Sequence, residues 1–205
     1  MATALSVFSR LLLWGAVAPQ RDTALVTQVI THVRAAAQLG RPILWAVDGF
    51  AAWTSSVLRV FRDPFRKGKR GRPQLVVWRD LHIVQVVKQY TGRHLSGVDR
   101  RLAHGCMRSA QAIMQATQVT LGVINTAYIE RLNATFRTWL PALTRRSRTP
   151  ARQLPHLEAA MFWMGVVYNF CRVHTTLQGT PAMAADLTDH VWSVSELLFY
   201  GVTHE

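Results

Sequence analysis

Acidic residues are scarce in this chain. Its 205 residues include 11 Asp and Glu against 24 Lys and Arg, which gives a formal net charge of +13. Such a cationic excess predicts a polyanionic partner, because each phosphate that a basic side chain neutralises releases counterions. Nucleic acid is the leading expectation, although association with the ribosome or with an anionic membrane surface would also account for the charge.

Cysteine and long apolar runs are scarce as well. Cys106 and Cys171 form no C-x-x-C pair and no Cys/His cluster with zinc spacing, so we expect a reduced, cytoplasmic protein. Association with the nucleoid is expected from the nucleic-acid partner and not from the cysteines. No apolar run reaches the roughly 18 to 20 residues that a membrane span needs. Residues 1–18 faintly resemble a secretory signal, but Arg10 lies late for that interpretation and the run 11–18 is typical of a strand.

The hydrophobic pattern predicts alternating strands and helices. Strands are expected at residues 11–18, 43–47, 74–78, 83–88 and about 94–102. Helices are expected at 23–39, 50–61, 107–117, across the segment that carries Glu130, and at 157–173, the last apolar nearly all round and therefore buried. The basic, Gly- and Pro-containing segments 62–73 and 145–150 are expected to be loops. The tail is expected to dock on the body through Trp192, Leu197, Leu198 and Phe199.

One acid follows a buried strand. Asp48 comes directly after the apolar run 43–47, and Gly49 beside it allows close approach. The carboxyl ends of strands are where α/β sheets place their sites, so Asp48 is a candidate functional residue. The alternatives are an Asx-turn or the N-cap of the following helix.

A second candidate acid belongs to a late helix. Glu130 is the only acid between Asp99 and Glu158. Helical spacing places Ile129, Leu132, Phe136 and Leu140 on one apolar stripe, and Glu130, Asn133 and Arg137 on a polar one. Asn125 or Thr126 is expected to cap the start of this helix. The alternative role for Glu130 is an ion pair with Arg131 or Arg137 on a solvated face.

Two stretches resemble DDE-type insertion-sequence transposases with an integrase core. The first resembles the segment that presents the last acid of that family, through Asn125, Thr126, Tyr128, Ile129, Glu130, Arg131, Asn133, Thr135 and Arg137. The second resembles the family's closing signature, through Tyr168, Asn169, Arg172, His174, Leu177, Thr180 and Pro181, with Val173 where proline is usual. We expect Arg172 and His174 to organise a helix end, with a contact to substrate as the alternative.

The resemblance implies an α/β fold with an RNase H-like mixed sheet flanked by helices. Residues 1–140 would form a partial core, and residues 141–205 a helical C-terminal cap packed on it. In the family a strand meander precedes the first helix and its first strand carries the first acid, whereas here only residues 11–18 are expected before the helix. The first strand is therefore expected to be missing, as in an N-terminally truncated transposase. Asp22 is a poor substitute, because it lies at the wrong end of the strand order.

The remaining acids have simpler roles. Asp22, Asp63, Asp80 and Asp99 lie in turns or beside arginines, so we expect them to cap helices or form ion pairs.

The resemblance also implies metal-dependent phosphodiester cleavage and strand transfer on transposon ends and target DNA, by a homo-oligomer on DNA and without a membrane. Asp48 and Glu130 would be catalytic metal ligands for Mg²⁺ or Mn²⁺, with two ions in a complete site. Because one of three acids is missing, a non-catalytic basic DNA-binding remnant is the alternative. An unrelated protein bound to ribosomal RNA is the third option.

Contacts to DNA are expected from one polar and nine basic residues, namely Arg66, Lys67, Lys69, Arg70, Arg72, Arg131, Asn133, Arg137, Arg145 and Arg146. Residues 70–73 match the core of an AT-hook, which lies in a narrow minor groove, but phosphate contact is the favoured interpretation. A solvated loop is the alternative for Arg145 and Arg146. Trp139, Trp163 and Trp192 are expected in the core rather than as platforms for bases.

Overall fold

The computed structural model describes residues 1–66, 68, 71–117, 123–144 and 151–201. The chain forms two compact units. The terminal unit comprises Met1–Gln20 and Tyr128–Glu205, and the central unit comprises Arg21–Ala127. The domain division expected at residue 140 stays a prediction.

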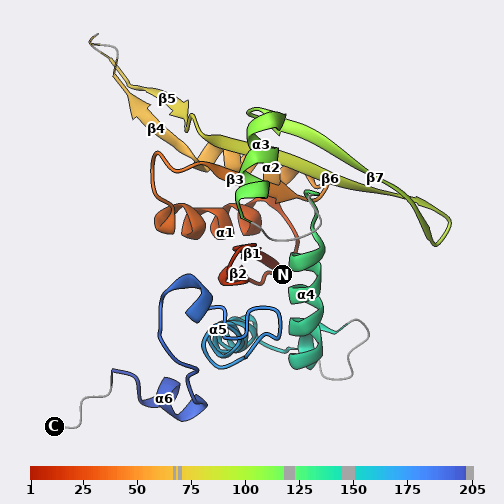
Figure 1. Ribbon diagram of the computed structural model, residues 1–205, viewed down its shortest axis with the longest axis vertical. Helices are drawn as coiled ribbons and strands as arrows, with labels where there is room; N and C mark the ends of the chain where they lie inside the picture. The colour runs from red at the N-terminus through yellow and green to blue at the C-terminus, as the bar shows by residue number, and fades with distance from the viewer. Residues whose placement is uncertain (67, 69–70, 118–122, 145–150, 202–205) are drawn as a thin grey trace. The chain divides into compact units, whose positions relative to one another are not determined.

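A mixed sheet forms the middle of the central unit (Figure 1). β6 (Leu81–Thr91) lies between β3 (Ile43–Val47), to which it is parallel, and β7 (His94–His104), to which it is antiparallel. Val84 and Val86 on one face of β6 pack against Ala110 of α3 (Met107–Ala116). On the other face, Gln85 donates a hydrogen bond to Thr54 of α2 (Ala51–Val60). The α/β class and the mixed sheet are confirmed.

Helix α1 (Thr23–Ala36) begins where the sequence predicts. Asp22 is its N-cap, and its Oδ1 accepts a hydrogen bond from the Leu25 amide at 2.9 Å. This bond satisfies one of the amide groups that a helix leaves unpaired at its first turn, so capping is the role of Asp22. The buried side of the helix consists of Leu25, Val26, Val29, Ile30 and Val33, which are the apolar positions of the helical pattern.

The segment expected as a basic loop is partly a strand, so the prediction is wrong for its first four residues. β4 (Arg62–Phe65) pairs antiparallel with β5 (Gln74–Val77), the latter as predicted. Asp63 stabilises this strand pair, because its carboxylate accepts hydrogen bonds from Arg34 and from the indole of Trp78, the residue after β5. An ion pair is therefore the role of Asp63, as expected.

The terminal unit contains a strand that the sequence did not predict. β1 (Ala2–Leu5) pairs antiparallel with β2 (Leu12–Ala16), so the expectation of a single strand before α1 is wrong. Neither strand contains an acid. Helices α4 (Ala127–Trp139), α5 (Leu154–Phe170) and α6 (Val194–Phe199) and the short 3-10 turns η1 (Pro141–Leu143) and η2 (Met183–Ala185) complete the unit.

Helix α5 packs closely on β2. A Cβ added to Gly165 would lie 2.8 Å from Leu12 Cδ2, and one added to Gly15 would lie 2.6 Å from Met161 Cε. Glycine at these two positions is what permits the approach. The buried residues of this core are Leu12, Val17, Leu132, Phe136, Met161 and Tyr168. The expectation that α5 is buried all round is wrong, because the Phe162 side chain on its other side is 64% exposed.

The closing signature holds the terminal unit together. The Asn169 side chain accepts from the Leu12 amide at 2.9 Å and donates to the Leu12 carbonyl at 3.0 Å, replacing a strand partner for β2. Thr180 and Pro181 are fully buried. The Arg172 guanidinium lies 4.7 Å from the centre of the Trp139 ring, at the end of α4. The expected role of Arg172 at the end of α5, and its alternative of a contact to substrate, stay predictions.

The tail docks through fewer residues than predicted. The Trp192 amide donates to the Phe170 carbonyl at 3.1 Å, and the two rings meet edge to face. Leu198 and Phe199, however, are 60% and 61% exposed, so their predicted docking is wrong. No helix among the described residues is long and apolar enough to cross a membrane.

We predict that Asn169→Ala destabilises the terminal unit. The substitution leaves two backbone groups of Leu12 without partners, at a cost of about 1–3 kcal/mol each. Urea unfolding followed by Trp fluorescence, together with faster hydrogen exchange of the Leu12 amide, measures the effect.

Gln153→Ala is the matched control. Gln153 precedes α5 and makes no capping hydrogen bond, so its loss is expected to change the free energy of unfolding by less than about 0.5 kcal/mol. Equal stability of the Asn169 and Gln153 variants would contradict the assigned role.

Candidate functional site

Asp48 directly follows the last residue of β3, as the sequence predicts. Its Oδ1 accepts from the Phe50 amide at 3.0 Å, which closes an Asx-turn. Its Oδ2 lies 2.6 Å from Arg21 Nη2, and both side chains are about half exposed. The N-cap of α2 is Phe50, so Asp48 does not cap that helix. The Asx-turn fixes the backbone and leaves the carboxylate at the surface beside one arginine.

Arg21 was missed as a partner of Asp48. It lies 27 positions away, and its guanidinium also lies 4.7 Å from the centre of the Phe50 ring. The sequence contains no local signal for this pair, because strand and helix periods report only on neighbours a few positions apart. The structure therefore shows Asp48 with a cationic partner that any bound metal would have to displace or accommodate.

Glu130 lies in the first turn of α4 and its side chain is exposed. Asn125 Oδ1 accepts from the Ala127 amide at 2.9 Å, which confirms the predicted cap. Leu132 and Phe136 are buried, so the apolar stripe is confirmed too. Asp48 belongs to the central unit and Glu130 to the terminal unit, so their meeting at one cation stays a prediction.

Among the neighbours of Glu130 on α4, Asn133 is bound within the fold. Its Oδ1 accepts from the Thr3 hydroxyl at 2.7 Å and ties α4 to β1. Arg131 and Arg137 are exposed. The contact of Asn133 could not be predicted, because the strand that carries Thr3 was not predicted. The DNA contacts expected from these three residues stay predictions.

The basic segments are only partly visible. Arg66 follows β4 and Arg72 precedes β5, and both are exposed. Lys67, Lys69, Arg70, Arg145 and Arg146 lie outside the described residues. The choice between an AT-hook and a phosphate contact therefore stays open.

The two candidate metal ligands are the carboxylates of Asp48 and Glu130, one in each unit. Among the residues that the structure describes, no three His, Cys, Asp or Glu side chains are grouped so that they could hold a metal ion. Asp99 forms an ion pair with Arg101 at 2.6 Å, as expected. The oxygens of Asp48 and Glu130 have the chemistry that Mg²⁺ and Mn²⁺ prefer, so the residues fit a hard divalent ion by ligand type.

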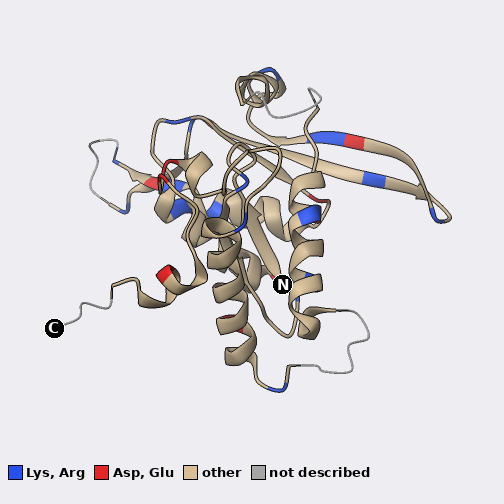
Figure 2. Ribbon diagram, turned by 60° about the horizontal axis from the view of Figure 1, so that its bottom comes forward, with Lys and Arg blue, Asp and Glu red and all other residues tan. Residues whose placement is uncertain are grey.

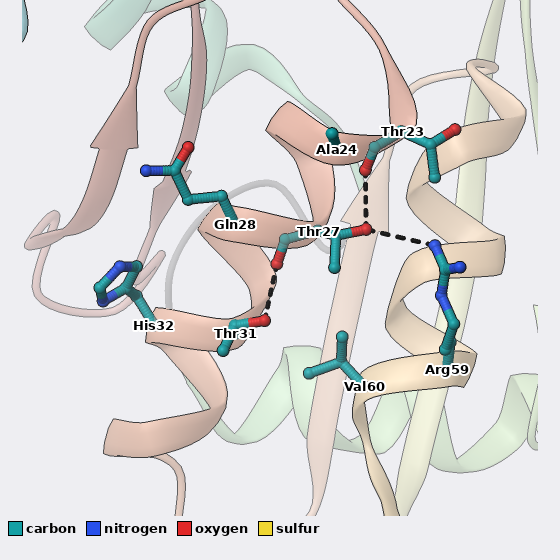
Figure 3. Close-up of a pocket in the computed structure, with 8 residues that line it drawn as sticks. All are labelled: Thr23, Ala24, Thr27, Gln28, Thr31, His32, Arg59 and Val60. Atoms are coloured by element: carbon teal, nitrogen blue, oxygen red, sulfur yellow. Dashed lines mark hydrogen bonds between the residues drawn. The ribbon is translucent and has the colours of Figure 1, made fainter.

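A groove lies along helices α1 and α2 (Figure 3). Thr23, Thr27 and Thr31 follow one another at helical spacing, and the hydroxyls of Thr27 and Thr31 donate to backbone carbonyls one turn earlier. Arg59 donates to the Thr27 hydroxyl at 3.3 Å. Its lining contains Gln28 and His32 but no acid, so the groove offers no carboxylate to a divalent ion.

Comparison of this chain with models of protein families, with curated proteins and with solved structures finds no match. The resemblance to transposases therefore stays a prediction from the residues of the two stretches.

His174 of the closing signature lies inside the terminal unit rather than at an open surface. Its ring meets the Tyr168 ring edge to face at 5.0 Å, and its amide donates to the Gly179 carbonyl. Burial, and then the charges of Arg172 and Arg10, hold the pKa of His174 below its ordinary value of 6.5. The neutral imidazole is therefore the form that the fold favours.

We predict opposite pH effects at two histidines. The neutral His174 stabilises the fold above pH 6.5, and this contribution is lost as the pH falls through the lowered pKa, so His174→Gln should flatten the loss of stability on acidification. The pKa of His190 is raised by its hydrogen bond to Asp189, so its contribution is present below pH 6.5 and is lost as the pH rises through the raised pKa.

His190→Gln should accordingly make the loss on acidification steeper. Urea unfolding of both variants and of the wild type between about pH 7.5 and about pH 5 measures the slopes. Parallel slopes for the two variants would contradict this assignment.

Proposed function

We propose that the chain is a DNA transposase of the insertion-sequence type, with an RNase H-like core that cleaves and joins phosphodiesters. The observation that carries the proposal is the place of Asp48 at the carboxyl end of β3, half exposed, in a chain whose α4 bears the matching Glu130 motif. A net charge of +13 supports DNA as the partner.

The chemistry of the proposal assigns a role to each residue. Asp48 and Glu130 would hold Mg²⁺ or Mn²⁺, two ions in a complete site, with oxygen ligands. Such ions supply a deprotonated water and neutralise charge on phosphorus. Arg131 and Arg137, exposed on the helix that carries Glu130, would contact the phosphates of transposon ends and target DNA. A homo-oligomer assembled on DNA belongs to the same proposal.

Without a metal ion, the carboxylate of Asp48 is paired with Arg21. An ion pair between two half-exposed side chains contributes about 0–1 kcal/mol, so a divalent ion competes with it at little cost. The pair would hold the carboxylate in place before the ion binds.

The second candidate is a DNA-binding remnant without turnover. The observation that favours it is that β1 and β2, which precede α1, contain no acid, whereas the resembling family places its first acid there. The basic residues would then bind DNA, and Asp48 would serve only in the Asx-turn and the ion pair.

We predict that nicking of supercoiled DNA in Mg²⁺ is lost in Asp48→Asn and in Glu130→Gln. The loss should exceed about 100-fold, because removing even a partner that only orients a metal ligand costs about 10- to 100-fold. Glu158→Gln is the control, since Glu158 is an exposed acid on α5 outside the proposed site. Binding of DNA that is salt-sensitive but independent of Mg²⁺ and of both acids, without nicking, would favour the remnant.

We further predict that Arg21→Gln tightens the binding of Mn²⁺ by up to about fivefold, the equivalent of about 1 kcal/mol. Electron paramagnetic resonance of free Mn²⁺ measures the affinity without any need for activity. Arg41→Gln removes the same charge from the opposite end of β3 and controls for the general field. If Asp48 and Glu130 share an ion, either neutral variant alone must weaken Mn²⁺ binding, and an effect of only one would contradict the shared site.

A further inference from the structure

The hairpin of β6 and β7 extends beyond the sheet to which it belongs. β3 pairs only with residues Leu81 to Gln85 of β6, whereas the pairing of β6 with β7 continues to Thr91 and His94. Residues 86–100 therefore form a two-stranded ribbon, which Figure 1 shows reaching past α3. We call this ribbon, together with Arg101 at its base, the arm (residues 86–101).

The arm has a defined shape. Its turn consists of Gly92 and Arg93, and Gly92 has φ +63°, which a two-residue turn of this kind requires at its first position. Its root is fixed, because Val86 packs in the core against α3 and Arg100 Nε donates to the Ile124 carbonyl at 2.7 Å. The ribbon is therefore held at one end and presents its far end to solvent.

The arm is cationic along its length. Lys88, Arg93, Arg100 and Arg101 are basic, and the one acid, Asp99, is paired with Arg101. Figure 2 shows basic positions on both strands and at the tip. A two-stranded ribbon with such a charge complements the phosphates that line a nucleic-acid groove.

The tip is also exposed and apolar in part. Tyr90 and Leu95 face each other across the strands and are 59% and 54% exposed. A cross-strand pair of this kind stabilises the end of the ribbon. That role does not account for the large exposed fraction of both side chains. An exposed end beside Arg93 and His94 is suited to contact with a large partner.

We propose that the arm binds duplex DNA. The major groove of B-DNA admits a two-stranded ribbon, so the arm would lie along it, with Lys88 and Arg93 on the flanking phosphates. The choice of DNA as the polyanion rests on the proposed function. The arm goes beyond it, because none of the DNA contacts expected from the sequence lies on β6 or β7.

The test compares two charge reversals in the full chain. Lys88→Glu/Arg93→Glu alters the arm, and Arg41→Glu/Arg79→Glu makes the same change in charge at exposed positions just before β3 and β6. Fluorescence anisotropy with a labelled duplex of mixed sequence gives the affinity as a function of salt. The arm variant should lower the slope of log affinity against log salt by about 2, since each lost phosphate contact contributes about 0.9. The control should keep the wild-type slope.

A variant with a shortened arm provides a second test in case the charge reversal does not fold. Val87 and Asp99 are paired, so an Asn-Gly turn joining them in place of residues 88–98 removes the outer part of the arm and keeps the sheet. With the circular dichroism of the wild type retained, its affinity for the duplex should fall and its salt slope should be lower by about 2, because it lacks the same two basic side chains.

The outcomes separate the arm from the proposed function. Unchanged binding by both arm variants, with nicking and binding by the wild type intact, would overturn the arm alone and leave its charges as protection of open strand edges. Loss of binding in the arm variants of a chain that never nicks would uphold the arm and overturn catalysis. A wild type that binds no duplex, or that binds RNA only, would overturn both.

Discussion

The pairing of β6 with two different neighbours is the constraint on which the central unit depends. Because β6 is parallel to β3 and Val47 pairs with Gln85, Asp48 follows β3 at the point where β6 continues beyond the sheet. Because β6 is also antiparallel to β7 and twice as long as β3, its far half continues as a ribbon. The buried residues Leu81, Ile83 and Val84 fix its position. The position of Asp48 and the extended ribbon therefore both depend on the pairing of β6.

In the terminal unit the corresponding constraint is the close contact of α5 with β2. Gly15 and Gly165 remove side chains where the two elements touch, and Asn169 supplies β2 with a donor and an acceptor. The signature that resembles the end of integrase-core transposases is in this structure a structural device. Asn169 bonds to the backbone of Leu12, and Arg172 and His174 contact aromatic rings. Packing within the terminal unit is a sufficient role for these three residues.

The small number of acids leaves the chain with an excess of positive charge. Asp22 caps a helix, and Asp63 and Asp99 pair with arginines. With these acids engaged locally, the 24 Lys and Arg still outnumber the 11 Asp and Glu, which leaves a net positive charge of +13. The arm carries part of that charge on an element that extends beyond its sheet.

The sequence alone determined the features that depend on a few neighbouring residues. The strand before Asp48, the Asn125 cap and the apolar stripe of α4 follow from periods and capping bonds that act within one strand or helix. The α/β class follows from the same signals. These features could be predicted because their partners lie within a few positions of one another.

Tertiary structure decided the rest. β1 is a short, weakly apolar segment that becomes a strand because β2 pairs with it and because Thr3 bonds to Asn133, 130 positions away. The Arg21 partner of Asp48 and the exposed side of α5 depend likewise on which segments meet. Contacts between distant positions leave no period in the sequence, since each pair is fixed only when the chain has folded around it.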